Sequence, residues 1–244
     1  MFSRLAIAFL LATGLAAPAA AQEPQDLLAK VDRNLNPESY ESLRKLVDIQ
    51  PDGTRKEYVL FTAKKGSDKV VGLFLSPASD KGRSTLRLGD NMWLFIPDVG
   101  KPLRITSLQS VTGGIFNNAD ILALDYAAEY QLEAQEEQDK VLVLRLKART
   151  DAVAYDRLVM TVDRGTLLPV TIEARAASGM LIKTLRFKEV KDFGNGIVRP
   201  SVIETDSPLY QGYTSLMIFG KIVPREFPDE VFTLNYLPRA QELR

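Results

Sequence analysis

Alternating apolar and polar residues dominate the chain between residues 43 and 223. Turn residues such as Pro51, Asp52 and Gly53 separate the alternating runs. This pattern predicts antiparallel strands, because the connections are too short for parallel crossovers. About ten strands are expected, at residues 43–49, 57–63, 70–75, 83–88, 92–96, 141–148, 158–162, 168–176, 180–190, 199–205 and 213–223.

Residues 92–96 are apolar at every position, and Pro97 ends the run. A strand that is apolar on both faces must be covered on both faces. The residues from 106 onward show no strand alternation, and they contain the sequence GGIF at 113–116 and a short helical pattern opening at 117–120. A long insertion with so many apolar residues favours a lid or a plug over a linker.

Residues 25–35 have the spacing of a short amphipathic helix. Four apolar residues fall on one face, and Asn36 and Pro37 follow the last of them. Such a short helix is stable only when its apolar stripe packs on something. The residues of that stripe are Leu27, Leu28, Val31 and Leu35.

Residues 1–21 have the features of a secretory signal peptide. Arg4 forms the positive region, residues 5–15 the apolar region, and residues 19–21 provide the small side chains of a cleavage site. The alternative is a membrane anchor, but the apolar run is shorter than the roughly 20 residues that a span needs. We therefore expect cleavage after Ala21, export to the periplasm and a mature domain of residues 22–244.

Composition removes several kinds of chemistry. The chain has 31 basic and 31 acidic residues, no cysteine and no histidine. The balanced charge argues against a nucleic-acid partner. Without Cys or His, a thiol nucleophile, a Cys/His zinc site and a Ser-His-Asp triad are excluded. A lipid hydrolase would need a lysine base, and neither G-x-S-x-G nor S-x-x-K occurs at a plausible turn. We expect a non-enzymatic protein without a cofactor or a metal.

Three segments together resemble a known family. They are the run at 91–97, the residues Leu-Arg-Ile at 103–105, and the Gly-rich apolar segment that ends at 118–121. This pattern resembles the outer-membrane lipoprotein-sorting proteins, which are related to the LolA and LolB carriers. The resemblance implies a mainly β fold with a single strongly curved antiparallel sheet, an open half-barrel, with an N-terminal helix and a helical lid. Composition alone leaves a barrel and a sandwich equally open.

The resemblance also implies a function. The family suggests a periplasmic carrier that shields the acyl chains of a lipoprotein or lipid during delivery towards the outer membrane. Burying about fifteen methylenes contributes roughly 12 kcal/mol at ~0.8 kcal/mol each, so the site should be apolar and concave. A lid that refills the space would lower the net affinity and permit release. The expected state is a monomer with acylated lipoprotein or lipid as cargo.

The candidate site has three parts. The expected latch of the lid, or contact for a head group, is Arg104, where the strand joins the lid. The expected cavity residues are Phe61, Leu73, Leu75, Leu86, Met92, Leu94, Ile96, Leu142, Leu144, Leu158 and Met160. The expected lid residues are Gly113, Gly114, Ile115, Phe116, Ile121 and Leu122, for which a core plug that never opens is the competing interpretation.

An alternative function is a non-catalytic accessory module that docks on an inner-membrane lipid-exporting transporter. The docking surface would be the outer side of residues 213–223, where Tyr213, Met217 and Phe219 share a face. The acidic residues between 129 and 139 are expected to form a solvated hairpin.

Overall fold

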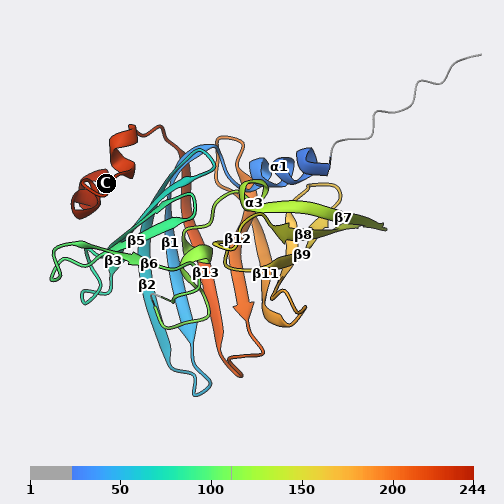
Figure 1. The fold of residues 1–244 in the computed structure, drawn as a ribbon, viewed down its shortest axis with the longest axis horizontal. Coiled ribbons are helices and arrows are strands. Elements are labelled where there is room, and N and C mark those ends of the chain that lie inside the picture. The colour runs from blue at the N-terminus through green and yellow to red at the C-terminus, as the bar shows by residue number, and fades with distance from the viewer. Residues whose placement is uncertain (1–23, 111) are drawn as a thin grey trace, which may run out of the picture.

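The computed structural model describes residues 24–110 and 112–244, so the predicted signal peptide at 1–21 lies outside the described residues. The described chain forms one open antiparallel sheet in the order β6-β5-β4-β3-β2-β1-β13-β12-β11-β10-β9-β8-β7 (Figure 1). The predicted mainly β, open-sheet class is confirmed, but the sheet has 13 strands where about ten were expected. The strands are β1 (Ser39–Ile49), β2 (Arg55–Lys65), β3 (Lys69–Ser76), β4 (Ser84–Leu88), β5 (Asn91–Phe95), β6 (Pro102–Ile105), β7 (Tyr130–Gln138), β8 (Val141–Ala148), β9 (Arg157–Asp163), β10 (Pro169–Arg175), β11 (Leu181–Asp192), β12 (Val198–Asp206) and β13 (Thr214–Pro224).

The strands that the sequence pattern missed are the two edges of the sheet, β6 and β7. An edge strand pairs on one side only, and these two bury few side chains. β6 has four residues and starts at a proline, which edge strands tolerate. β7 is exposed along most of its length, so its acidic residues show no apolar alternation. Of the acidic run predicted as a solvated hairpin, the residues from Glu133 to Asp139 lie in β7 and the turn into β8. Glu129 instead lies in the preceding helix and pairs with the buried Arg87.

Five short helices complete the described chain. None of the helices in this part of the protein is long and apolar enough to cross a membrane. The predicted N-terminal helix is present and buries Leu28, Val31 and Leu35 against the sheet. The helices are α1 (Pro24–Leu35), α2 (Asn118–Ile121), α3 (Tyr126–Glu129), η1 (Asp229–Phe232) and η2 (Leu237–Leu243).

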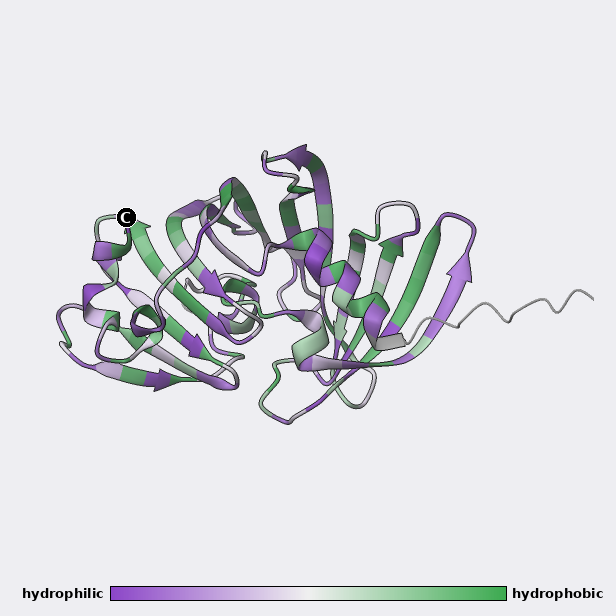
Figure 2. Cartoon of the chain, turned by 90° about the horizontal axis from the view of Figure 1, so that it is seen from above, coloured by the Kyte–Doolittle hydropathy of each residue, from purple (hydrophilic) through white to green (hydrophobic). Residues whose placement is uncertain are grey.

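The two faces of the sheet carry separate apolar cores. Hydrophobic and hydrophilic residues alternate along many of the strands, as burial of one face requires (Figure 2), whereas β2–β4 bury both faces. The inner face, which α1 and the segment after β6 cover, holds the larger core, including Leu60, Leu144 and Met160. The outer face of β2–β5 holds the smaller core, which packs against residues 227–243. We call residues 106–129 the lid and residues 227–243 the C-terminal cover.

Candidate functional site

The lid joins the two edge strands of the sheet. It leaves β6, crosses the inner face in front of the central strands and enters β7 at the opposite edge (Figure 1). Four of its apolar side chains lie in the larger core, where Phe116 is 1% exposed and Leu122 is 0% exposed; the others are Ile121 and Leu124. The lid is therefore a plug that fills the inner side of the sheet.

A capping box shapes the middle of the lid. The Asn117 side chain accepts a hydrogen bond from the Asp120 amide at 3.1 Å, and the Asn117 amide donates to Asp120 Oδ2 at 2.9 Å. This reciprocal pair starts α2 at Asn118. The Tyr155 hydroxyl accepts from Asn117 Nδ2 at 2.8 Å and donates to Asp120 Oδ1 at 3.0 Å. Burial raises the pKa of Tyr155 well above its ordinary value, so the phenol remains a donor.

Three basic side chains of the sheet hold backbone carbonyls of the lid. Lys183 Nζ donates to the Ile115 carbonyl at 2.6 Å and forms an ion pair with Asp120 at 2.8 Å. Arg44 Nη1 donates to the Ile121 carbonyl at 2.9 Å. Arg87 Nη1 donates to the next carbonyl, that of Leu122, at 3.1 Å. All three basic side chains are buried, where charged hydrogen bonds are strong and a lost partner is costly. These contacts form a polar latch.

Gly114 lies where the lid comes closest to the sheet. The next amide, Ile115 N, donates to Ser215 Oγ at 3.1 Å, and that hydroxyl donates to Asp48 Oδ1 at 2.6 Å. A Cβ added at Gly114 would lie 1.8 Å from Asp48 Oδ1. Only glycine therefore fits here while the lid is closed.

Helix α1 holds the end of the lid. Asp32 of α1 accepts hydrogen bonds from the amides of Tyr126 and Ala127 at 2.8 Å each, at the start of α3. Burial raises the pKa of Asp32 to about 7, against the opposing effect of the Ala127 amide. Nearby, Lys64 forms an ion pair with Asp125 at 2.8 Å. The closed lid therefore depends on α1 as well as on the sheet.

A small apolar cavity of about 70 Å³ remains beneath the lid. Pockets that enclose small-molecule ligands have volumes of about 300–1,000 Å³, so this cavity cannot enclose an acyl chain while the lid is closed. The lining includes Phe116 and Leu124 from the lid and Leu158, Ile172 and Leu185 from the sheet. Space for a long apolar ligand would come from displacing these lid side chains.

Comparisons with known proteins agree with this architecture. A family model described as "uncharacterized protein" matches residues 66–239. The chain belongs to this family and has the LolA-like fold. A LolA superfamily protein from Nitrosomonas europaea is 28% identical, with a TM-score of 0.80, and the match covers 88% of this chain and 100% of that one. The predicted resemblance to lipoprotein-sorting proteins is confirmed.

Two further solved structures have the same fold. A putative outer membrane lipoprotein-sorting protein domain from Vibrio parahaemolyticus is 16% identical, with a TM-score of 0.76, and the match covers 88% of this chain and 98% of that one. A DUF1329 family protein from Desulfovibrio piger is 21% identical, with a TM-score of 0.74 and coverage of 88% and 97%. No curated protein matches this chain in sequence.

The structure of this LolA-like protein divides the expected cavity residues between the two faces. Those from the first part of the sheet lie on the outer face, against or beside the C-terminal cover: Phe61, Leu73, Leu75 and Leu86. Those in the inner core are Met92, Leu142, Leu144, Leu158 and Met160, of which Leu158 lines the cavity. Leu94 and Ile96 are half-buried, and Leu94 pairs with Thr85 in the sheet.

The expected lid residues all lie in the lid. Ile115, Phe116, Ile121 and Leu122 are buried, whereas Gly113 is exposed, with φ +80°. Arg104 is exposed on edge strand β6, where it bonds to Asn91 and lies 5.8 Å from the centre of the Trp93 ring. Trp93 belongs to the outer core. Arg104 is thus placed away from the carbonyls of the lid, and Arg44, Arg87 and Lys183 occupy the latching positions.

The latch residues had a weak signal in the sequence. Lys183 shares its strand face with Leu185 and Phe187, and Arg44 shares its face with Leu46, so each charge interrupts an inward-facing apolar series. A buried charge in such a series needs a partner from another element. This signal could have identified both residues, although not their acceptors in the lid.

The expected docking surface on β13 is not exposed. Met217 is 2% exposed and Phe219 is 5% exposed, and both belong to the inner core. The residues of β13 alternate as predicted, but the side that carries Met217 and Phe219 faces the inner core. The prediction of an exposed apolar surface on this strand was wrong.

Proposed function

We propose that this protein is a periplasmic carrier that encloses the acyl chains of a lipoprotein or lipid beneath the lid, for delivery towards the outer membrane. The observation that carries the proposal is the way the lid is held. Its buried side chains fill an apolar face of the sheet, while basic side chains of the sheet donate hydrogen bonds to its backbone carbonyls. The LolA-like fold supports it. The cleaved signal peptide and the mature domain 22–244 belong to the same proposal.

The energetics favour exchange between lid and cargo. Burying about fifteen methylenes contributes roughly 12 kcal/mol, but cargo must first displace Phe116, Ile121 and Leu122, which bury apolar surface of their own. The net affinity is the difference between the two, so the carrier can release what it binds. A cavity that stayed open would hold the chains too tightly for transfer.

The test is native mass spectrometry of the mature protein, purified from periplasm without detergent. We expect a population carrying an acylated adduct, and uptake of a fluorescent fatty-acid probe by the unloaded population. The matched variants are Phe116→Asp in the lid and Val99→Asp at an exposed position outside it. Phe116→Asp places a carboxylate on the side of the lid that would cover the acyl chains, so it should abolish loading and leave the circular dichroism spectrum of the sheet intact. Val99→Asp should load normally.

A protein that carries no adduct and takes up no probe would contradict the carrier function. Equal loading of the Phe116→Asp variant and the wild type would contradict the role of the lid.

A further inference from the structure

A polar stripe crosses the inner face of strands β1–β4 beneath the lid. One residue from each strand belongs to the stripe, and each pairs with the next across the sheet: Ser42, Thr62, Gly72 and Thr85. Direct partners across strands share a face of the sheet. A Cβ added at Gly72 would lie 2.8 Å from Thr85 Oγ1 and 3.4 Å from Cδ2 of Leu122. The stripe therefore lies directly against a lid side chain.

Two hydroxyl groups of this polar stripe have no hydrogen-bond partner. They belong to Thr62 and Thr85, which are 0% and 2% exposed. Buried polar groups in proteins nearly always have a partner, because leaving one unpaired is costly. The apolar side chain of Leu122 cannot supply one. The closed structure thus holds two donors that lack an acceptor, on the face that the lid would uncover.

Three buried cations flank the stripe. Val70 of β3 pairs with Lys64 on one side and with Arg87 on the other, so these two cations lie in the row of residues next to the polar stripe. Arg44 pairs with Leu60 and lies in the row on the opposite side of the stripe. All three also bond to neighbouring groups of the sheet and its turns. Two of the three have an anionic partner, and both partners belong to the lid: Asp125 for Lys64 and Glu129 for Arg87.

The lid also supplies carbonyl acceptors to two of these cations. Arg44 bonds to the Ile121 carbonyl and Arg87 to the Leu122 carbonyl. Lifting the lid would remove both carboxylates and both carbonyls together. Buried cations that lose a carboxylate or a carbonyl partner are unfavourable even when some hydrogen bonds to the sheet remain, so a cargo that covers them in place of the lid must bring acceptors of its own.

We propose that, once the lid lifts, the polar stripe and its flanking cations bind the phosphate of an anionic lipid head group. Phosphate oxygens suit the guanidinium groups of Arg44 and Arg87, the ammonium of Lys64 and the two free hydroxyls. The acyl chains then lie on the apolar half of the inner face, over β8–β11. This inference rests on the proposed carrier function and names the class of its cargo.

The test compares two probes that differ only in the phosphate: dioctanoyl phosphatidic acid and dioctanoylglycerol. Isothermal titration calorimetry on the mature protein should show about tenfold tighter binding of the phosphatidic acid. The double variant Thr62→Val/Thr85→Val loses no hydrogen bond of the closed state. It should keep its fold, and the ratio of its affinities for phosphatidic acid and dioctanoylglycerol should fall about tenfold relative to the wild type.

The matched control is Thr205→Val on β12. Its hydroxyl is also buried without a partner, but three strands away from Thr62. This variant should retain the full preference for the phosphatidic acid. An equal loss in Thr205→Val would show that removing any buried hydroxyl has this effect, and would overturn the assignment of the stripe.

The remaining outcomes separate this inference from the carrier function. Equal affinity of the wild type for both lipids would overturn the head-group site and leave the carrier function standing. Binding of neither lipid would overturn both. Binding of inorganic phosphate alone, weakened in Thr62→Val/Thr85→Val, would identify a free-phosphate site and overturn the lipid assignment.

Discussion

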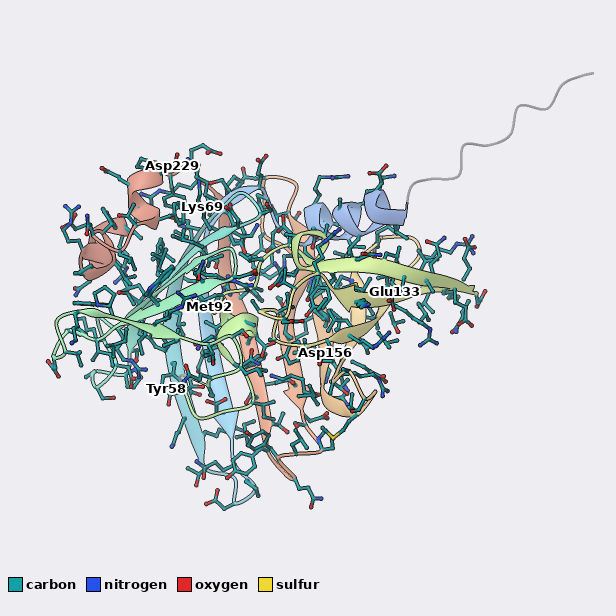
Figure 3. The ribbon with its side chains drawn as sticks, viewed as in Figure 1. Tyr58, Lys69, Met92, Glu133, Asp156 and Asp229 are labelled. Carbon is teal, nitrogen blue, oxygen red and sulfur yellow. The ribbon has the colours of Figure 1, made fainter. Side chains whose placement is uncertain are left out.

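The C-terminal cover and the lid lie on opposite faces of one sheet, and they are attached in different ways. The cover packs Phe227, Phe232 and Leu237 into the outer core. Its carbonyls accept hydrogen bonds from Lys65, Ser84 and Arg225, but neither of the two cations is buried. Lys65 and Lys69 pair with Asp229 at its start, in an exposed position where ion pairs contribute little (Figure 3). The lid combines apolar contacts with hydrogen bonds from buried cations to its carbonyls.

This difference indicates which cover can exchange with a ligand. Departure of the C-terminal cover would expose an apolar core. Departure of the lid would also leave the buried cations Arg44, Arg87 and Lys183 without their acceptors in the lid, which a ligand could replace. The contacts of the lid can be replaced, because acyl chains can take over its apolar contacts and other acceptors its hydrogen bonds. We therefore expect the C-terminal cover to stabilise the fold and the lid to exchange with a ligand.

The largest expected effect is on the stability of the C-terminal cover. Phe232 is 3% exposed and lies in the outer core. Phe232→Ala should lower the free energy of unfolding by about 3–5 kcal/mol, because it leaves a cavity in this core. Urea denaturation measures the change. Uptake of the fatty-acid probe should remain that of the wild type under conditions where the variant is folded; a parallel loss of uptake would show that the two covers are not independent.

A smaller effect is expected at the closest approach of the lid. Gly114→Ala places a Cβ against Asp48 and should destabilise the closed lid by about 1–3 kcal/mol. Amide hydrogen exchange at residues 115–122 should rise by about tenfold, while exchange in the C-terminal cover stays unchanged.

Two variants control for the added methyl group in Gly114→Ala. Gly165→Ala adds a Cβ at 3.5 Å from Asp163 Oδ1, an ordinary contact, and should leave the lid protected. Asp48→Ala/Gly114→Ala removes the clash and should restore much of the protection of the lid. Unchanged exchange in Gly114→Ala alone would mean that the lid is not closed as described.

A third expected effect depends on pH. Burial raises the pKa of Asp32 to about 7 from its ordinary 3.8, so the folded chain retains a proton that the unfolded chain releases in this range. The stabilising contribution of this group is complete below about pH 4 and is lost as the pH rises to about 7. The free energy of unfolding should therefore fall over this interval in the wild type.

The matched variant is Asp32→Asn, which remains neutral and should lack this part of the slope. Asp26→Asn, at an exposed position of the same helix, should keep the slope of the wild type. Denaturant unfolding of the three proteins at several pH values between 4 and 8 measures the difference. Identical slopes in Asp32→Asn and the wild type would refute the role of Asp32.

The sequence predicted the strands whose apolar side chains alternate, together with α1 and the position of the lid. It could not assign faces in β2–β4, because these strands bury both sides: Leu60 lies in the inner core and Phe61 in the outer core. Alternation reveals that a strand has two sides, but not which side meets the lid. Phe61, Leu73 and Leu86 were expected in the cavity for this reason.

The C-terminal cover could not be predicted from periodicity. Its residues form two short 3-10 helices, whose apolar side chains follow neither the strand nor the α-helix repeat. The edge strands were missed because an exposed strand has little apolar pattern. The latch depends on contacts between residues far apart in the chain, such as Arg44 and Ile121, which no local pattern specifies.

The central claim is that the lid must move before an acyl chain can enter. The chain has no cysteine, and a side chain at residue 114 would meet that of Asp48. Asp48→Cys/Gly114→Cys removes the carboxylate that blocks residue 114 and places two thiols where the lid contacts the sheet, for cross-linking by oxidation. Uptake of the fluorescent fatty-acid probe by this variant is measured before and after reduction, with the two single-cysteine variants as controls. We expect the oxidised protein to take up no probe and the reduced protein to recover uptake; equal uptake in both states would contradict the account.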